Sequence, residues 1–318
     1  MNLAFVLDPL DGIKTTKDSS FAMMREAAHR GHRIFSMQQG DIALVGGKVV
    51  GRALELKLTG NAGKGAVWYQ PGKLEDRPLK SFDAVLMRKD PPFDMEYVYT
   101  TYLLEHAERG GAKVFNSPRA IRDHNEKFAI AEFPQLTVPC LVTRDGERIR
   151  EFVSRQGECV LKPLDGMGGV SIYRVSPGER NLNVIIETLT GNGAHSVMAQ
   201  AYIPEIKAGD KRILLIGGTV IPFSLARIPK AGETRGNLAA GGTGVAQELS
   251  RRDREIAATL APVLAERGLI LVGLDVIGDY LTEINVTSPT CFQEIADQSG
   301  FNVAAVMIDA LERLHNPG

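Results

Sequence analysis

The stretch LVGLDVIGDYLTEINVTSPT, residues 271–290, contains two β-rich runs on either side of a turn. Residues 271–277 and 281–286 are rich in branched apolar side chains, and the pair Gly278-Asp279 between them is typical of a tight turn. The stretch therefore predicts a β-hairpin, and the length of its loop decides which side chains share a face.

The apolar pattern of this hairpin favours one register. A two-residue loop at Gly278-Asp279 would pair Leu274 with Glu283 and mix apolar and charged groups on one face. A three-residue loop ending at Tyr280 would keep the apolar groups together. Its pairs would be Val276 with Thr282, Leu274 with Ile284, and Val272 with Val286. Because a buried face specifies register strongly, we expect the three-residue loop, which a bulge could close.

The opposite face of the hairpin would then carry Asp275, Glu283 and Asn285. Two carboxylates on one face repel each other unless a cation lies between them. Oxygen-only ligands of this kind suit Mg²⁺ whose coordination is completed by substrate phosphates. The pattern predicts either such a metal site or a solvated polar face on an ordinary hairpin.

The composition is that of an ordinary globular protein with more than one unit. The chain has 318 residues, which exceeds the usual size of one core, and 44% of them are hydrophobic. Its 37 basic and 38 acidic residues argue against a general nucleic-acid or membrane partner. The first strand is short and lacks a basic lead-in, so we expect no signal peptide, and no 18-residue apolar run follows. Three cysteines without CxxC pairing, Cys140, Cys159 and Cys291, fit a reducing cytoplasm.

The first third of the chain alternates strands and helices as an α/β domain does. Residues 3–7 read as a buried strand, followed by a loop and a helix that Ser19 or Ser20 would cap. Ligands bind at the carboxyl ends of such strands. Residues 83–87 form a second buried strand that runs into Arg88-Lys89 and a Pro-Pro pair. The two cations either hold an anionic substrate or belong to a solvated strand end.

Two glycine pairs predict further hairpins. Residues 42–58 would turn at Gly46-Gly47, and residues 211–228 would turn at Gly217-Gly218. Between these hairpins, residues 59–81 are rich in Gly, Pro and Lys, and they read as a loop or surface ribbon.

A glycine-rich loop joins two strands between residues 159 and 175. Lys162 lies in the apolar strand before the loop, where an ammonium is costly unless it meets an anion. Gly166, Gly168 and Gly169 would let backbone N–H groups approach a phosphate closely. The loop is neither a Walker A sequence nor a GxGxxG fingerprint followed by a helix. A plain tight turn therefore remains open beside phosphate binding.

A second long segment, residues 229–244, has almost no core-forming side chains. A loop of this length inside a compact domain is uncommon unless it is functional or disordered. We expect a mobile lid that closes over bound substrate and carries Arg235 and Asn237, with a floppy linker as the alternative.

Seven stretches, taken together, make this sequence resemble the ATP-grasp superfamily and, more closely, the prokaryotic glutathione synthetase family. They are residues 17–23, 87–94, 125–127, 161–169, 209–212, 235–242 and 281–290. They run in the order of the family over nearly the whole chain. The match is weakest from about residue 44 to residue 80.

The resemblance implies an ATP-grasp fold, of mixed α/β and α+β class, with an N-terminal α/β (pre-ATP-grasp) domain. Residues 1–122 would form the N-terminal substrate-binding domain. Residues 123–200 would form the central subdomain, with the glycine loop at 164–170. Residues 201–318 would form the C-terminal subdomain, with the lid and the metal-binding hairpin. ATP would lie between two antiparallel sheets.

The same resemblance implies a role for particular residues. Those expected to contact ATP are Lys127, Lys162, Gly166, Gly168, Gly169, Gln200, Ala201, Tyr202, Ile203 and Asp210. Those expected to act in catalysis are Arg212 and Arg227, with Arg235 and Asn237 from the lid. Those expected near the peptide substrate are Asp18, Ser19, Ser20, Arg88, Lys89, Asp90, Ser288, Pro289 and Thr290. Asp275, Glu283 and Asn285 would hold Mg²⁺, which Mn²⁺ could replace.

The implied reaction joins γ-glutamylcysteine to glycine and converts ATP to ADP and phosphate. An acyl phosphate forms first and the glycine amine then attacks it, so no covalent enzyme intermediate is needed. The lack of a Cys/His or Ser/His nucleophile pattern agrees with this. Two alternatives stay open: another ATP-grasp carboxylate–amine ligase, and a non-catalytic ATP-binding regulator on the same fold. We further expect a cytoplasmic homo-oligomer with no nucleic-acid or membrane partner.

Overall fold

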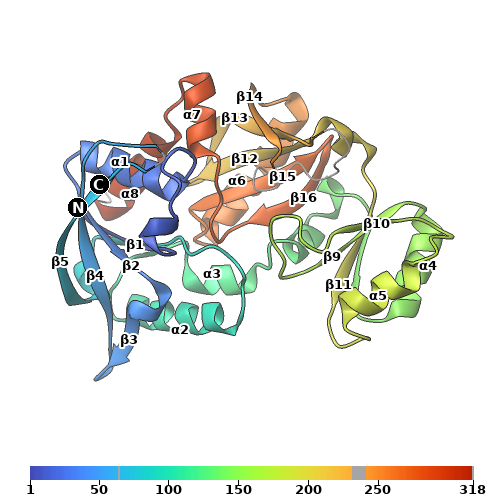
Figure 1. The fold of residues 1–318 in the computed structure, drawn as a ribbon, viewed down its shortest axis with the longest axis horizontal. Helices are drawn as coiled ribbons and strands as arrows, with labels where there is room; N and C mark the ends of the chain where they lie inside the picture. The colour runs from blue at the N-terminus through green and yellow to red at the C-terminus, as the bar shows by residue number, and fades with distance from the viewer. Residues whose placement is uncertain (64, 231–240, 317–318) are drawn as a thin grey trace.

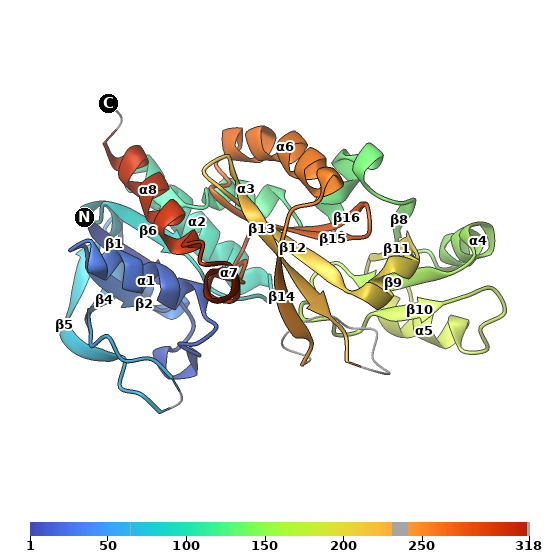
Figure 2. The same ribbon diagram turned by 90° about the horizontal axis from the view of Figure 1, so that it is seen from above.

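The computed structural model describes residues 1–63, 65–230 and 241–316, and three β-sheets organise them (Figures 1 and 2). The first is a mixed sheet of order β3-β4-β2-β1-β6-β7, with β5 paired to β4. Its strands are β1 (Asn2–Val6), β2 (Arg33–Met37), β3 (Ile42–Val45), β4 (Lys48–Leu58), β5 (Tyr69–Pro78), β6 (Ala84–Met87) and β7 (Val114–Phe115). Since β1 runs parallel to both β2 and β6, the loops that follow β1 and β6 leave the sheet at the same edge.

The cap of the first helix and the structure of residues 59–81 test two predictions made from the sequence. The helix α1 (Ser19–His29) is capped by Asp18, whose carboxylate accepts a 2.7 Å hydrogen bond from the backbone N–H of Phe21. The predicted cap at Ser19 or Ser20 was wrong because a better acceptor lies one residue earlier. Within residues 59–81, the ribbon alternative is correct, since β5 pairs with β4 over most of its length.

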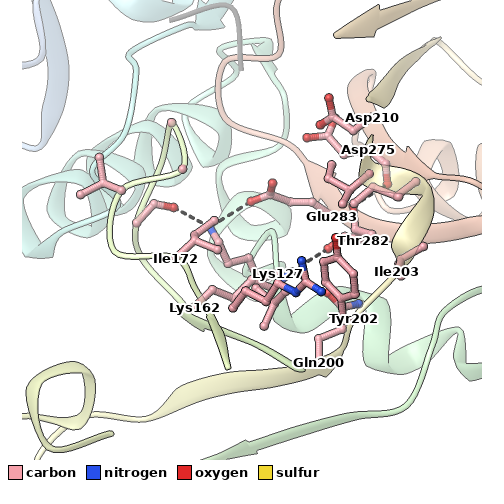
Figure 3. Close-up of a pocket in the computed structure, with 18 of the residues that line it drawn as sticks. Lys127, Lys162, Ile172, Gln200, Tyr202, Ile203, Asp210, Asp275, Thr282 and Glu283 are labelled. Carbon is pink, nitrogen blue, oxygen red and sulfur yellow. Dashed lines mark hydrogen bonds and ion pairs between the residues drawn. The ribbon is translucent and has the colours of Figure 1, made fainter. Parts of the chain in front are cut away.

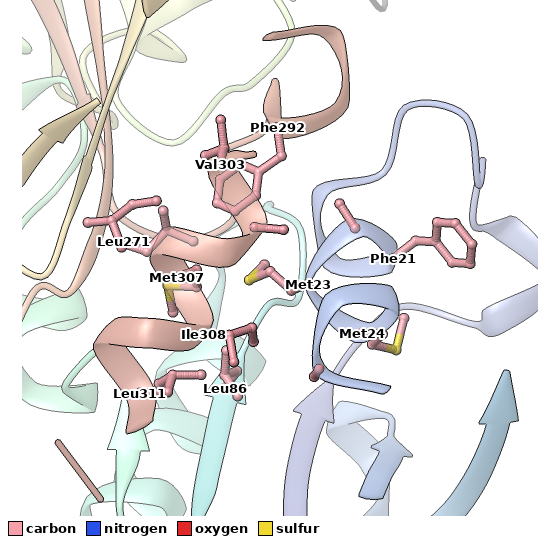
Figure 4. Packing of buried hydrophobic residues seen from close by; sticks show 14 of the residues in the cluster. Phe21, Met23, Met24, Leu86, Leu271, Phe292, Val303, Met307, Ile308 and Leu311 are labelled. Atoms are coloured by element: carbon pink, nitrogen blue, oxygen red, sulfur yellow. The ribbon is translucent and has the colours of Figure 1, made fainter. Parts of the chain in front are cut away.

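The C-terminal helix returns to the N-terminal sheet (Figure 4). The helix α8 (Val303–His315) packs beside α1, and Met307 and Ile308 join Met23 and Leu86 in one buried cluster. Burying each such side chain contributes roughly 1.5–3 kcal/mol. The C-terminal helix therefore completes the core of the first part of the chain.

The second sheet is antiparallel, with the order β10-β9-β11-β8. Its strands are β8 (Cys140–Thr143), β9 (Cys159–Pro163), β10 (Tyr173–Val175) and β11 (Val197–Ala201). The helices α4 (Gly146–Gln156) and α5 (Leu182–Thr190) cover one face through an apolar cluster that includes Ile149, Val153 and Ile186. The other face is left for the third sheet (Figure 2).

The third sheet is also antiparallel and has the order β14-β13-β12-β15-β16. Its strands are β12 (Asp210–Ile216), β13 (Thr219–Ile228), β14 (Thr243–Glu248), β15 (Leu271–Ile277) and β16 (Tyr280–Asn285). The helix α6 (Arg251–Glu266) buries Ile256, Leu260 and Leu264 against it. The predicted hairpins at Gly46-Gly47 and Gly217-Gly218 are both confirmed.

The hairpin β15–β16 places Asp275 and Glu283 on one face, as predicted, but its loop length differs from the prediction. Ile277 pairs with Tyr280 and Val276 with Leu281, so the loop has two residues and the expected three-residue loop was wrong. A bulge at Thr282 then shifts the register, and Asp275 pairs with Glu283 and Leu274 with Ile284. The extra residue lets a tight turn coexist with a buried apolar face. Asp275 and Glu283 therefore lie on the same face.

The remaining helices are α2 (Met95–Arg109), α3 (Pro118–Asp123) and α7 (Phe292–Ser299). Six short 3-10 helices connect the described elements: η1 (Leu10–Gly12), η2 (Gln39–Asp41), η3 (Leu79–Ser81), η4 (Phe128–Glu132), η5 (Pro134–Leu136) and η6 (Pro204–Ala208). Over the described residues, none of the helices combines the length and the hydropathy needed to cross a membrane.

Candidate active site

A cavity that takes in about 1110 Å³, including space open to solvent, lies between the second and third sheets (Figure 3). This larger cavity has apolar walls on both sides, from Val160 and Ile172 on one and from Ile206 and Ile277 on the other. Its polar lining residues are Lys127, Lys162, Arg174, Gln200, Tyr202, Asp210, Asp275, Thr282 and Glu283. Apolar walls together with two lysines suit a ligand that has a ring system and phosphates.

Lys162 projects from β9 into this larger cavity and is buried. Its ammonium donates to the Gln200 side-chain oxygen at 3.0 Å and to the Thr282 carbonyl at 3.2 Å. That carbonyl belongs to the bulge residue of β16, so the bulge helps to place the lysine. Burial lowers the pKa of the Lys162 ammonium to about 8, against the opposing effect of Glu283. A cation held with neutral partners in a buried wall favours an anionic ligand.

Lys127 lies at the start of η4, beside the glycine loop. Its ammonium forms a 2.9 Å ion pair with Glu283 and donates to the Gly166 carbonyl. Gly168 and Gly169 line the same cavity and have positive φ values of 65° and 79°, which favour glycine. The loop thus brings backbone groups close to two lysines, as phosphate binding requires.

The end of β11 and the two residues that follow it form part of the wall of the larger cavity. Gln200, Ala201, Tyr202 and Ile203 all line it. The Arg174 guanidinium lies 4.0 Å from the centroid of the Tyr202 ring, a stacking arrangement that holds the ring at the entrance. Sequence reasoning did not single out Arg174, although its place on β10 opposite β9 would have been the signal.

Four charged side chains on β12, β13 and β15 form one buried network. Asp275 pairs with Arg212 at 3.0 Å and with Arg227 at 2.8 Å, and Arg227 also pairs with Asp210. Burial raises the pKa of Asp275, but the two arginines outweigh it and hold that pKa below its usual range. For Asp210 burial prevails over Arg227, and its pKa is raised. Both arginines therefore stay charged although they are buried.

A second cavity takes in about 830 Å³, again including space open to solvent, and is called the smaller cavity. It adjoins the larger one, and Asp275, Glu283, Met167 and Gly168 line both. Its remaining wall is formed by Asp90, Pro91, Glu126, Arg212, Arg227, Asn285, Thr287, Ser288, Thr290 and Cys291. The two arginines thus face the smaller cavity, on the other side of Asp275 from the lysines.

The three predicted metal ligands all line the smaller cavity. The Asn285 side chain donates its N–H to the Gly273 carbonyl at 3.1 Å, which leaves its oxygen as the ligand atom. In the described part of the chain, no group of three His, Cys, Asp or Glu side chains is arranged for a metal, so the set depends on the amide as its third member. Oxygen donors from Asp275 and Glu283 fit Mg²⁺, which would take the place of Lys127 beside Glu283.

The residues expected near the peptide substrate are divided between two places. Arg88 is buried and donates to the Ser20 hydroxyl at 3.0 Å and to the Pro289 carbonyl at 2.9 Å. Its Nη1 atom is enclosed without a partner among the described residues. Burial lowers the pKa of this guanidinium, while Asp18 and Asp90 act against that effect. A buried cation with a free N–H is typical of a site that receives a carboxylate.

The other expected substrate residues have structural partners or lie on the rim. Lys89 pairs with Asp8 at 2.9 Å, and Ser19 accepts a hydrogen bond from the N–H of Phe292. Asp90, Ser288 and Thr290 line the smaller cavity. Lys89 is the least suited of the set because its charge is already compensated.

Arg235 and Asn237, with most of the expected lid, lie outside the described residues. Two residues that sequence reasoning did not assign a role join the parts of the site. Asn116 donates hydrogen bonds to the Leu271 and Val286 carbonyls and accepts one from the Leu271 N–H, each at 2.8 Å. It therefore links the start of β15 to the residue that follows β16. Glu126 accepts hydrogen bonds from Val286 and Thr287.

Two antiparallel sheets that enclose a slot with lysines and a glycine loop define an ATP-grasp ligase with an N-terminal α/β part. Models of the prokaryotic glutathione synthetase N-terminal domain and ATP-grasp domain match residues 1–122 and 126–300. The chain belongs to the prokaryotic glutathione synthetase family.

Relatives support the same placement. Glutathione synthetase of Ralstonia nicotianae is 63% identical over 313 residues, which cover 98% of this chain and 96% of that protein. The Nitrosomonas europaea enzyme of the same name is 61% identical, with 98% of each chain covered.

Two solved structures share the fold at low identity. The D-cycloserine synthetase DcsG has a TM-score of 0.69 at 14% identity, with 99% of this chain and 100% of that chain covered. The ATP-grasp ligase PsnB, solved with a minimal precursor, Mg and ADP, has a TM-score of 0.61 at 18% identity, with 98% of each chain covered.

Proposed function

We propose that this chain catalyses the ATP-dependent ligation of γ-glutamylcysteine to glycine. The observation that carries the proposal is the pair of cavities that meet at Asp275 and Glu283. The larger cavity has the shape and charge to bind a nucleotide. The smaller cavity presents Arg212 and Arg227 to a second substrate. A phosphoryl group at the junction would be within reach of both.

The larger cavity would hold ATP. Val160, Ile172 and the residues Tyr202 and Ile203 that follow β11 would enclose the adenine, and Asp210 lies where a ribose hydroxyl could bond. Lys127, Lys162 and the glycine loop would meet the phosphates through charge-assisted hydrogen bonds. Lys162 would then exchange its neutral partners for an anion.

The smaller cavity would hold the acceptor carboxylate. Transfer of the γ-phosphoryl group to the cysteinyl carboxylate breaks the bond to ADP and forms an acyl phosphate. The glycine amine then attacks the acyl carbon and phosphate leaves. Arg212 and Arg227 would stabilise the charge that spreads over the transferring oxygens. Asp275, Glu283 and Asn285 would hold Mg²⁺, which supplies charge neutralisation between phosphates and carboxylate when it is bound.

The N-terminal part would bind the far end of the dipeptide. Arg88 and Ser20 would contact a carboxylate of the dipeptide, with Asp18 near its amino group. We also propose that residues 1–122, 123–200 and 201–318 act as the three structural units, and that the enzyme works as a cytoplasmic homo-oligomer.

One assay tests the proposal. The chain is incubated with γ-glutamylcysteine, glycine and Mg-ATP, and the tripeptide is detected by mass while ADP is measured in parallel. We expect one ADP per tripeptide. ADP release with a different acid and amine, but not with this pair, would favour another carboxylate–amine ligase. ATP binding with no turnover on a broad substrate panel would favour a regulator.

A further inference from the structure

Glu126 is a carboxylate in the reaction region to which no role has been assigned above. It lines the smaller cavity together with Arg212, Arg227 and Glu283. One of its oxygens, Oε1, accepts three hydrogen bonds, from the N–H groups of Val286 and Thr287 at 2.9 and 3.0 Å and from the Thr287 hydroxyl at 2.8 Å. These bonds fix the carboxylate in place.

The second oxygen of Glu126 is free for a ligand. Over the residues that the structure describes, Oε2 has no hydrogen-bond partner, and it is not among the enclosed polar atoms that lack one. Since Glu126 lines the smaller cavity, this oxygen is open to that space. The carboxylate therefore has one anchored oxygen and one available oxygen.

The charges around the cavity set Glu126 apart from its neighbours. Asp275 is compensated by two arginines and Glu283 by Lys127. Glu126 has only neutral donors, and no ion pair joins it to another described residue. Asp90 also lacks a cation in the described chain, but it lies on the exposed rim. An uncompensated carboxylate in a largely buried wall favours a cationic ligand.

We propose that Glu126 binds the ammonium group of the amine substrate and so positions its nitrogen for attack. This inference rests on the ligase reaction proposed above. The dipeptide also has an ammonium, but the residue proposed to contact it, Asp18, lies outside the wall of the smaller cavity. The nucleophile must approach the phosphorylated carboxyl group on the side of Arg212 and Arg227, which is the side that Glu126 faces.

The test compares Glu126→Gln with the matched surface variant Glu132→Gln. Glutamine keeps an oxygen that can accept the three anchoring hydrogen bonds, and it replaces the free, charged oxygen with an uncharged NH2 group. Glu132 lies six positions after Glu126, is exposed, and pairs with Arg267 at 2.8 Å. Thermal unfolding of both variants checks that they fold as the parent does.

Glycine and hydroxylamine are then used as alternative nucleophiles. Hydroxylamine is largely uncharged at neutral pH, so it traps the acyl phosphate without needing a carboxylate. We expect Glu126→Gln to raise the KM for glycine by about 10- to 100-fold, the usual effect of losing a hydrogen bond to a charged group. Hydroxamate formation, the KM for ATP and the Mg²⁺ titration should match the parent, and Glu132→Gln should match it throughout.

Three results would overturn the inference. An unchanged KM for glycine would show that Glu126 does not bind the amine. A raised Mg²⁺ requirement would make Glu126 a metal ligand, and a parallel loss of hydroxamate and tripeptide would make it only an anchor for the chain after β16. If the parent forms neither tripeptide nor hydroxamate, the proposed function has failed, which is distinguishable from each of these outcomes.

Discussion

Above pH 7, we expect the Lys162 side chain to take up a proton when ATP binds. In the free protein, burial lowers the pKa of this ammonium from 10.5 to about 8. A bound phosphate would favour the charged form and raise the pKa toward its ordinary value. Since the bound state then holds more protons than the free state, affinity for ATP should fall as the pH rises from about 8 to about 10.

The size of the effect follows from the two pKa values. If ATP restores the ordinary pKa of Lys162, uptake would be about 0.5 proton per nucleotide at pH 8 and about 0.9 at pH 9. The corresponding coupling free energy is at most about 3 kcal/mol. Removing the ammonium in Lys162→Met should accordingly weaken ATP use by roughly 2 kcal/mol or more.

Calorimetry measures the uptake directly. Binding of a non-hydrolysable ATP analogue is titrated at pH 8 and pH 9 in two buffers with different ionisation enthalpies, and the difference in heat gives the number of protons. Lys162→Met should abolish the uptake, whereas the exposed Lys80→Met should retain it. Equal proton uptake by the parent and Lys162→Met would refute the assignment of Lys162 to the phosphates.

Four further substitutions probe other contacts. Glu283→Gln and Asn285→Ala should each raise the Mg²⁺ concentration needed for half-maximal rate, and an unchanged Mg²⁺ titration would remove that residue from the metal site. Arg88→Met should raise the KM for the dipeptide about tenfold and leave that for ATP unchanged, because the carboxylate loses a charge-assisted partner; equal rises in both would point to a folding defect. Asn116→Ala should lower the free energy of unfolding by about 3 kcal/mol in urea titrations, since the Leu271 and Val286 backbones lose buried partners; a change below about 1 kcal/mol would mean that water replaces the amide.

Sequence patterns located most of the strands and the chemical groups of the site. Alternation of apolar residues placed Leu274 and Ile284 on one face of the last hairpin, and this put Asp275 and Glu283 together on the other. The predicted loop length was wrong because the alternation of apolar and polar residues does not reveal the bulge at Thr282. The same bulge exposes a carbonyl to Lys162, a contact that spacing could not predict.

Local sequence also determined the residue types that phosphate chemistry needs: a lysine within an apolar strand and glycines that accept positive φ. Only the tertiary structure decided which groups the charged residues of the site contact. Arg212 and Arg227 lie on separate strands, and antiparallel pairing of β12 with β13 and β15 brings both to Asp275. Glu126 is far in sequence from Thr287, and only their hydrogen bonds in the folded chain show that the two residues meet. The physical reason is that propensity and periodicity act over a few residues, whereas compensation of buried charge depends on which distant strands pack together.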